Sequence, residues 1–366
     1  MRVLHVAAGN LYGGVERILV EVARAGTAAH EFAICFEGRL LDDLRAAGGS
    51  THVLRAVRFS RPATLWRARR NLRSVVAAGA FDSVVCHSPW AYALASPELP
   101  PEVRRVVWAH DVLDGTHWTE RRIARTPPDL MVCNSHATAD ALRRWIGSVP
   151  LEVVHAPVAP NPHPAAERDR IRDELGVSRD TIVILIASRF ERWKGHGVLL
   201  DAATHLKGPW TIWIAGGPQR GPEEVLAKQL RAMCAAPGLN GRVRFLGERR
   251  DVPRLLRGAD VLCQPNTAPE PFGIVFAEAL YAGLPVVTSD AGGAREIVHR
   301  TCGVLVPIGD GRSLATALQA LIDDPALRAR LGSAGPARAA SICSPASQVA
   351  RLEALVTANP RARAPS

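Results

Sequence analysis

The sequence has no hydrophobic run long enough to cross a membrane and no recognisable set of metal ligands. Its longest apolar stretches, such as residues 182–187, fall far short of the roughly 20 residues that a membrane-spanning helix requires. No D-x-D, H-E-x-x-H or C-x-x-C pattern occurs, so we expect no metal and no other cofactor. The first residues match a signal peptide poorly, and the seven cysteines are scattered. We therefore expect a cytoplasmic protein with reduced thiols.

Lysine is scarce although the chain is basic. Only Lys194, Lys207 and Lys228 are lysines among 45 basic residues, and the formal net charge is +10. This charge favours contact with phosphates, but its sign does not choose among nucleotides, lipids and nucleic acids. No nucleic-acid recognition motif occurs, so we expect no nucleic-acid partner. Because lysine is rare here, a lysine in this chain indicates a functional position more strongly than an arginine does.

Two series of short β-rich runs alternate with helical segments and predict two Rossmann-like parallel sheets. The first series is 3–7, 32–36, 83–86, 105–108 and 130–133, and the second is 181–188, 211–217, 243–247, 260–266 and 284–290. Between them, residues 155–164 hold four prolines, which neither a helix nor a central strand tolerates. We predict a first Rossmann-like domain over 1–155, a linker over 156–170, a second Rossmann-like domain over 171–335, and a C-terminal helix with a disordered tail over 336–366. Ligands of such sheets bind at the carboxyl ends of the strands, which predicts a cleft between the domains.

The stretch APEPFGIVFAEALYAGLP, residues 268–285, carries two glutamates and no basic residue. Prolines and Gly273 place Glu270 in a loop, whereas Glu278 lies about one turn inside an apolar and therefore buried helix. Buried carboxylates need hydrogen-bond donors, and sugar or ribose hydroxyls can supply them. The free amides that open the helix favour phosphate. The alternative is structural: Glu270 is a helix N-terminal acid and Glu278 pairs with an arginine elsewhere.

A second polar motif, SRFERWKG, follows the predicted strand over 181–188. Arg189 emerges at the carboxyl end of this strand, and Lys194 opens the next helical segment. Two cations here could hold a diphosphate and offset the charge that develops as it leaves. The alternative is a solvated loop without a ligand.

Together these motifs resemble the retaining GT-B glycosyltransferases of family 4, also called glycosyl transferases group 1. The resemblance rests on the E-x7-E pattern of Glu270 and Glu278, the R-x4-K element of Arg189 and Lys194, a Gly-Gly loop at 13–14, and GGAREIV after residues 284–290. It runs from residue 1 to about 335. It implies an α/β protein with the GT-B fold, in which two Rossmann-like domains face each other across a cleft. By this resemblance the domain over 1–155 would bind the acceptor and the domain over 171–335 the nucleotide sugar.

The resemblance also implies a role for each matching residue. Glu270 would bind donor-sugar hydroxyls and Glu278 the ribose, while Arg189 and Lys194 would neutralise the diphosphate. His110, in WAHD, matches the histidine of the family that contacts the donor sugar. Further donor-binding positions are Gly13, Gly14, Phe272, Gly273 and Ile274. The catalytic set is therefore His110, Arg189, Lys194 and Glu270.

The expected activity is that of a retaining, metal-independent hexosyltransferase in glycan, polysaccharide or glycolipid biosynthesis. It would move a sugar from a UDP-, GDP- or ADP-sugar to a hydroxyl of a saccharide or lipid-linked acceptor. A GT-B nucleotide-sugar epimerase and a non-catalytic nucleotide-sugar-binding protein are the alternatives. A dinucleotide oxidoreductase is weaker, because AAGNLYGG does not match G-x-G-x-x-G. The linker lacks the N-G-V-D run common in the family, and no loop identifies one acceptor.

Residues 55–73 carry seven arginines, and no acid occurs between Asp43 and Asp82. Leu65, Leu72 and Val76 recur on one side of the predicted helix, which makes it basic and amphipathic. One interpretation is a solvated surface helix. The other is peripheral contact with anionic lipid on the inner face of the membrane, where a lipid-linked acceptor would lie.

Overall fold

The computed structural model describes residues 1–219 and 221–357, and the chain forms two compact units. Unit 1 comprises residues 1–158 together with the segment from Cys343 onward, and unit 2 comprises residues 159–342. The predicted disordered tail, NPRARAPS, lies outside the described residues. Within the described ranges, no helix combines the length and apolar character that a membrane crossing requires.

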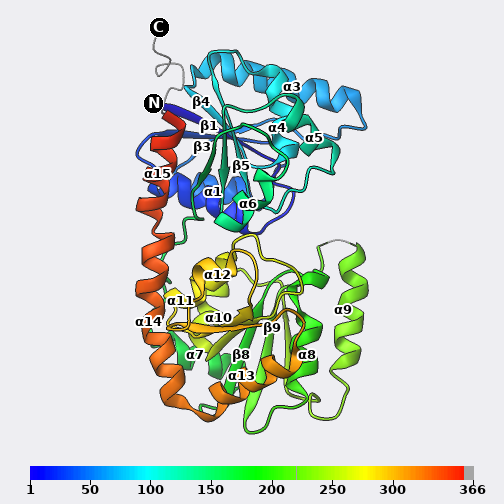
Figure 1. The fold of residues 1–366 in the computed structure, drawn as a ribbon, viewed down its shortest axis with the longest axis vertical. Helices are drawn as coiled ribbons and strands as arrows, with labels where there is room; N and C mark the ends of the chain where they lie inside the picture. Colours follow the sequence, from blue (N-terminus) through cyan, green and yellow to red (C-terminus); the bar gives the residue numbers. More distant parts are fainter. Residues whose placement is uncertain (220, 358–366) are drawn as a thin grey trace. The chain divides into compact units, whose positions relative to one another are not determined.

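Unit 1 is built on a seven-stranded parallel sheet in the order β3-β2-β1-β4-β5-β6-β7 (Figure 1). The last four residues of its five central strands are buried and mostly apolar, as expected for a parallel sheet covered on both faces. The strands are β1 Arg2–Ala7, β2 Ala29–Ile34, β3 Ser50–Val53, β4 Ser83–Cys86, β5 Arg104–Ala109, β6 Leu130–Cys133 and β7 Leu151–Val153.

The helices of unit 1 connect these strands, and the last helix of the chain joins them beside α1 (Figure 1). Two of the connecting helices begin with a serine whose hydroxyl accepts an amide N–H of the first turn, at Ser88 and Ser135. The helices are α1 Gly14–Ala25, α2 Arg39–Ala46, α3 Pro62–Gly79, α4 Pro89–Ala95, η1 Ser96–Glu98, α5 Trp118–Arg125, α6 His136–Arg143 and α15 Pro345–Thr357.

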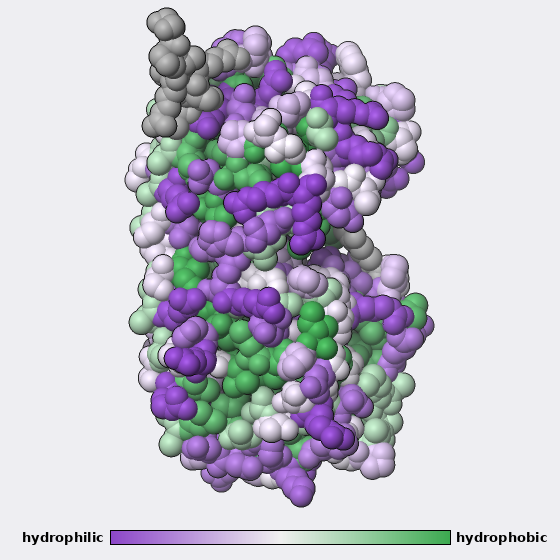
Figure 2. Space-filling model, in the orientation of Figure 1, coloured by the Kyte–Doolittle hydropathy of each residue, from purple (hydrophilic) through white to green (hydrophobic). Residues whose placement is uncertain are grey.

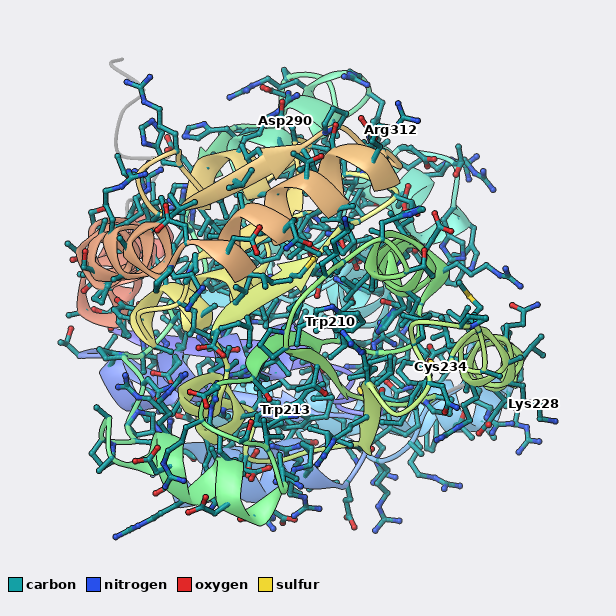
Figure 3. The ribbon with its side chains drawn as sticks, turned by 90° about the horizontal axis from the view of Figure 1, so that it is seen from below. Trp210, Trp213, Lys228, Cys234, Asp290 and Arg312 are labelled. Atoms are coloured by element: carbon teal, nitrogen blue, oxygen red, sulfur yellow. The ribbon has the colours of Figure 1, made fainter. Side chains whose placement is uncertain are left out.

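Unit 2 repeats the architecture with a six-stranded parallel sheet in the order β10-β9-β8-β11-β12-β13. Its strands are β8 Ile182–Ala187, β9 Trp210–Ala215, β10 Val243–Gly247, β11 Val261–Gln264, β12 Val286–Ser289 and β13 Gly303–Val306. Its helices are α7 Glu167–Glu174, η2 Arg192–Lys194, α8 His196–Ala203, α9 Gly221–Met233, α10 Val252–Gly258, α11 Ile274–Tyr281, α12 Ala294–Ile297, α13 Gly311–Asp323 and α14 Pro325–Cys343. Trp210 and Trp213 of β9 are buried in its core, whereas Lys228 of α9 points outward (Figure 3).

The prediction of two Rossmann-like parallel sheets is confirmed. Every predicted strand overlaps an observed one, but the sequence missed β3, β7 and β13. All three are edge strands of three or four residues. An edge strand is paired on one side only and needs no long apolar run, so its sequence signal is weak.

The division of the chain differs from the boundaries predicted from the sequence. Residues from 159 onward belong to unit 2 because Asn161 donates to Pro253 O at 2.8 Å and Arg257 donates to His163 O at 2.7 Å. At the other end, α14 continues past residue 335 to Cys343, and α15 returns to unit 1. Within the described residues, the C-terminal segment therefore contributes two helices that belong to different units, rather than one helix.

A buried arginine fastens α7 to the rest of unit 2. Arg172 is 1% exposed, donates Nε–H to Gly258 O at 2.9 Å and Nη1–H to Thr181 O at 3.1 Å, and forms an ion pair with Asp260. Asp260 also accepts the N–H of Val183, at the start of β8, at 2.7 Å. This network ties α7 to β8, the strand that Arg189 and Lys194 follow in the sequence.

We expect Arg172→Ala to destabilise unit 2 by about 2–3 kcal/mol, because the carbonyls of Gly258 and Thr181 lose a buried donor and Asp260 keeps only the half-exposed Arg168 as its ion-pair partner. Urea unfolding followed by circular dichroism measures the loss. The matched control on the same helix is Arg170→Ala, since the Arg170 side chain is 76% exposed and pairs with Glu167 at only 3.7 Å. The control should lose less than about 1 kcal/mol. Equal unfolding midpoints for the two variants would contradict this account of Arg172.

Candidate active site

Glu270 lies in the loop after β11 and is held by three hydrogen-bond donors. Asn266 Nδ2 donates to Glu270 Oε2 at 2.7 Å, Lys194 Nζ at 2.9 Å and Gln264 Nε2 at 3.2 Å. The glutamate side chain is only 8% exposed. All three donors converge on one oxygen, and Oε1 accepts no hydrogen bond from any described residue. The arrangement stabilises a buried carboxylate and leaves one of its oxygens able to accept from a ligand.

Two of these donors were missed by the sequence analysis. Gln264 ends β11 and Asn266 follows it, and both are buried. Gln264 Nε2 also donates to Asn266 Oδ1 at 3.0 Å, so the two amides orient each other. The available signal was the pair of polar residues directly after the apolar run Val261–Cys263. Polar side chains at the carboxyl end of a buried parallel strand are typical of ligand sites.

Lys194 reaches Glu270 from a different loop, at the end of η2. Its Nζ lies 2.9 Å from Glu270 Oε2 and 3.7 Å from the ring centroid of Trp193. The two loops are joined by the hydrogen bond from Thr267 N–H to Trp193 O at 2.7 Å. The prediction had placed Lys194 and Glu270 in one ligand site without a direct contact between them. The structure makes them an ion pair.

Two glycines allow the loops to approach closely. Gly195 follows Lys194 with φ +77°, and a Cβ on it would lie 1.8 Å from Pro265 O. Gly292 has φ +62°, and its Cβ would lie 2.3 Å from Glu270 O. The neighbouring Gly293 donates its N–H to the same carbonyl at 2.7 Å. Any side chain at Gly195 or Gly292 would therefore push these loops away from the Lys194–Glu270 pair.

Arg189 does not share this ion pair. Its Nη2 donates to Glu191 Oε1 at 2.5 Å, and its Nη1 lies 3.7 Å from Glu223 Oε1. The side chain is half-buried at the end of β8, where the sequence placed it. Two carboxylates therefore already balance the charge of Arg189, so Lys194 and Arg189 occupy different electrostatic surroundings.

The loop after Glu270 leads into α11, as the sequence indicated. Gly273 caps the helix with φ +98°, and its carbonyl accepts the N–H of Phe276 at 3.0 Å. Phe272 is buried and Ile274 begins the helix. Glu278 lies on the next turn and is buried, as its apolar surroundings in the sequence predicted.

The predicted glycine loop of unit 1 opens α1. Gly13 is the N-cap of this helix, and its N–H donates to Glu16 Oε2 at 2.9 Å. Gly14 is the first residue of the helix. The amide of Gly13 therefore already has an acceptor within unit 1.

His110 directly follows β5 and is the other predicted site residue of unit 1. It is 8% exposed, and its ring stacks on His87 with centroids 5.2 Å apart. Its Nε2 lies 3.0 Å from His87 Nδ1, whereas its Nδ1 has no partner among the described residues. Burial lowers the pKa of His110 to about 3, so the ring is neutral at pH 7. His87 was not singled out from the sequence.

Comparison with known proteins identifies the family. The model described as "Glycosyltransferase Family 4" matches residues 12–161, and the model described as "Glycosyl transferases group 1" matches residues 167–338. The phosphatidyl-myo-inositol mannosyltransferase of Mycolicibacterium smegmatis is 30% identical over 341 residues, covering 87% of this chain and 83% of that protein. The chain belongs to the group 1 glycosyltransferases with the GT-B fold.

Other relatives of this group 1 glycosyltransferase are matched over different shares of their length. D-inositol 3-phosphate glycosyltransferase of Xylanimonas cellulosilytica is 33% identical over 261 residues, which cover 68% of this chain but 58% of the relative. The crystal structure of Anabaena HepE in complex with UDP and glucose superimposes with a TM-score of 0.88 at 25% identity, covering 98% of this chain and 100% of that one.

The family matches divide the candidate site residues of the glycosyltransferase between the two units. Arg189, Lys194, Glu270 and Glu278 fall in the segment matched as group 1, whereas Gly13, Gly14 and His110 fall in the segment matched as family 4. Within unit 2, the structure brings Lys194 and Glu270 together and adds two buried amides. Within unit 1, it places His110 against a second histidine.

Proposed function

We propose that this protein is a retaining hexosyltransferase that uses a nucleotide-diphosphate sugar and an acceptor hydroxyl. The observation that carries the proposal is the buried Glu270 carboxylate, whose Oε2 is held by Lys194, Asn266 and Gln264 while Oε1 accepts from no described residue. A fixed carboxylate of this kind suits a ligand rich in hydroxyls, because each hydroxyl can donate to the open oxygen.

The ammonium group of Lys194 can bind the donor diphosphate while it remains paired with Glu270. An ammonium group has three N–H donors, and one of them is used for Glu270. When another N–H turns to a phosphate oxygen, Asn266 and Gln264 still hold the carboxylate. The site thus keeps its geometry while a cation offsets the charge that builds on the leaving diphosphate.

The bond changes balance without a further reactant. The acceptor oxygen forms a bond to the anomeric carbon, the bond from that carbon to the diphosphate oxygen breaks, and the acceptor proton passes to the leaving diphosphate. Attack from the face of the departing group, favoured by the family resemblance, gives retention at the anomeric carbon. A covalent glycosyl-enzyme intermediate is the alternative route to retention.

The relatives support a nucleotide-sugar donor and a phosphate-bearing acceptor. Anabaena HepE is described in complex with UDP and with UDP-glucose. Two relatives are named for D-inositol 3-phosphate and phosphatidyl-myo-inositol. We propose a UDP-sugar as the first donor to test and an anionic, lipid-linked or saccharide acceptor. A thermal-shift series with UDP, GDP and ADP sugars ranks the donors, because a ligand bound only by the folded state raises its apparent stability.

We expect Lys194→Ala and Glu270→Gln each to lower the rate of transfer roughly 100- to 1,000-fold, because each removes a charged group at the diphosphate or sugar. Product formation from the donor identified by thermal shift measures the loss. Lys228→Ala and Glu224→Gln are the matched controls, since both side chains are exposed on α9.

Three outcomes separate the candidate functions. Controls with full activity and site variants without it support the transferase. Release of free nucleotide with an epimerised sugar and no acceptor product would favour an epimerase. Donor binding by the wild type with no turnover on any acceptor would favour a binding protein. Near-wild-type transfer by Lys194→Ala or Glu270→Gln would overturn the site assignment.

We also propose that transfer needs no metal ion. Lys194 and Arg189 supply positive charge on one β-strand connection, after β8. We expect the transfer rate to be unchanged after incubation with EDTA. A rate that falls on chelation and returns with magnesium or manganese would show that a divalent cation is required.

Residues of α3 and the loop before it form a basic surface that we propose contacts anionic lipid. Trp66 is 63% exposed, and the guanidinium of Arg70 lies 5.6 Å from its ring centroid. Exposed tryptophan with nearby arginine is typical of a membrane interface. Hydrophilic residues also gather on the face of the molecule near α3 and α5 (Figure 2). The exposed arginines of the basic surface are Arg55, Arg58, Arg61, Arg67 and Arg70.

Two arginines of the predicted amphipathic helix do not belong to this surface. Arg73 donates to Glu98 Oε2 through Nε at 3.0 Å and Nη2 at 2.6 Å. Arg69 lies 3.8 Å from the same carboxylate and donates to Ala93 O at 3.1 Å. The sequence between Asp43 and Asp82 contains no acid, but η1 supplies one in space. These two arginines are therefore paired within unit 1.

We expect wild-type protein to co-sediment with vesicles containing phosphatidylserine at low salt, and the variant with Arg61, Arg67 and Arg70 changed to Gln to lose most of this binding. Each basic residue contributes about 1 kcal/mol near an anionic surface. The matched control changes three exposed arginines of unit 2, Arg300, Arg312 and Arg330, to Gln. Absent wild-type binding, or equal losses in both variants, would contradict a role for this surface and favour a soluble acceptor.

A further inference from the structure

Four histidines form a hydrogen-bonded chain across the sheet of unit 1. His110 Nε2 lies 3.0 Å from His87 Nδ1, His87 Nε2 lies 2.9 Å from His5 Nδ1, and His5 Nε2 lies 2.8 Å from His30 Nδ1. The chain ends at Glu353, whose Oε1 lies 2.9 Å from His30 Nε2. The order β2-β1-β4-β5 in the sheet places one histidine on, or directly after, each successive strand. Sequence reasoning used only His110 of these residues.

The chain of four histidines is buried along its length. His5, His87 and His110 are at most 8% exposed, and the side chain of His30 is 3% exposed. Burial, followed by the proximity of the neighbouring rings, holds the pKa values of His5 and His87 well below their usual range. These rings are therefore uncharged at neutral pH.

Glu353 is an acceptor with fixed partners. Its carboxylate accepts the N–H of Thr27 at 2.7 Å, the N–H of Ala28 at 2.8 Å and the hydroxyl of Thr27 at 2.6 Å. Burial alone would raise the pKa of Glu353, but the hydrogen bonds from Ala28, Thr27 and His30 outweigh it and lower the pKa to about 2. The group is ionised at neutral pH and cannot donate to His30.

With one proton on each of the four rings, the direction of every hydrogen bond is fixed. The four imidazoles then carry four N–H protons, and the histidine chain contains four contacts that each need one. Since Glu353 only accepts, His30 Nε2–H donates to it, His5 Nε2–H donates to His30, and His87 Nε2–H donates to His5. The fourth proton is on His110 Nε2 and points to His87. None remains for His110 Nδ1, which has no partner among the described residues.

We propose that Glu353 is a positioning residue that, through His30, His5 and His87, holds His110 in the Nε2–H tautomer with Nδ1 as a hydrogen-bond acceptor. A ring nitrogen without a proton favours a ligand group that donates a hydrogen bond, such as a hydroxyl. It disfavours a carboxylate or phosphate oxygen, which can only accept. That this hydroxyl belongs to a sugar rests on the proposed function. The tautomer itself does not, because it follows from contacts within unit 1 and one proton on each ring.

A second proton on His30 would give the histidine chain an alternative protonation state, and this makes the proposal testable. If His30 carried a second proton, His30 Nδ1–H would donate to His5, and each following bond would reverse. His110 would then carry its proton on Nδ1 and donate rather than accept. The ionisation of a single ring, far from His110 along the chain, would thus exchange an acceptor for a donor.

The experiment measures the tautomer of His110 directly. Protein labelled with ¹⁵N in histidine is examined by two-dimensional NMR at pH 7, where Nδ1 and Nε2 of each tautomer have distinct shifts, and His110→Gln identifies the His110 signals. We expect wild type to show the Nε2–H form. An Nδ1–H or doubly protonated ring in wild type would overturn the proposal without any further variant.

Variants of Glu353 test its role at the far end of the chain. Glu353→Ala removes the hydrogen-bond acceptor of His30, so we expect mixed tautomers at His110. In assays with donor sugar and acceptor substrate, we expect a roughly 3- to 10-fold lower kcat/KM, which corresponds to the loss of one neutral hydrogen bond. Glu353→Gln keeps an accepting oxygen and should restore the Nε2–H form. Arg351→Ala, on the same helix and paired with Glu152 at 3.5 Å, is the control for general effects on α15.

A substitution that interrupts the histidine chain at His5 gives an independent measurement if Glu353→Ala does not fold. His5→Leu leaves the contacts of Glu353 with Thr27 and Ala28 in place, and it too should give mixed tautomers at His110. A pure Nε2–H signal in Glu353→Ala or in His5→Leu would show that the chain does not set the tautomer. If the tautomers behave as expected but no sugar is transferred, the proposed function fails and the positioning role stands.

Discussion

The ion pair between Lys194 and Glu270 is the constraint on which the candidate site of unit 2 depends. A carboxylate buried among apolar residues is stable only when its charge is balanced and its lone pairs accept hydrogen bonds. Lys194 supplies the charge, while Asn266 and Gln264 supply further donors. These groups come from the connections that follow β8 and β11, which are neighbours in the sheet. The strand order therefore creates the site, and the loops hold it only because Gly195 can approach Pro265 without a side chain.

Much of this arrangement could be predicted from the sequence. The apolar runs give ten of the strands. Nine are central strands, which are buried on both faces and must be continuously apolar, and the tenth is the edge strand β10. The edge strands β3, β7 and β13 lack that requirement and were missed. For the site, Arg189, Lys194, Glu270 and Glu278 were found because charged residues stand out beside apolar runs. Gln264 and Asn266 are uncharged and were overlooked, although they contribute two of the three donors to Glu270.

Contacts between distant segments explain the remaining differences. Glu98 is 25 residues from Arg73 in sequence but holds it through two hydrogen bonds. The sequence pattern of residues 55–73 does not show that Arg69 and Arg73 pair with a carboxylate on another element. The same limit applies to the histidines: positions 5, 30, 87 and 110 show no periodicity, and only the strand order brings them into line. The acidic end of that line comes from residue 353, beyond the whole of unit 2.

The return of the chain to unit 1 gives the last helix a chemical role as well as a packing role. Helix α15 buries Val349, Leu352 and Val356, which is sufficient to dock it. Glu353 lies among these apolar residues, where an ionised carboxylate would be unfavourable unless the partner segment supplied donors. Thr27, Ala28 and His30 supply them, and, with one proton on each ring, an acceptor at His30 Nε2 orients every ring behind it. Apolar packing of α15 thus determines where the carboxylate lies, and the carboxylate in turn determines which nitrogen of His110 carries the proton.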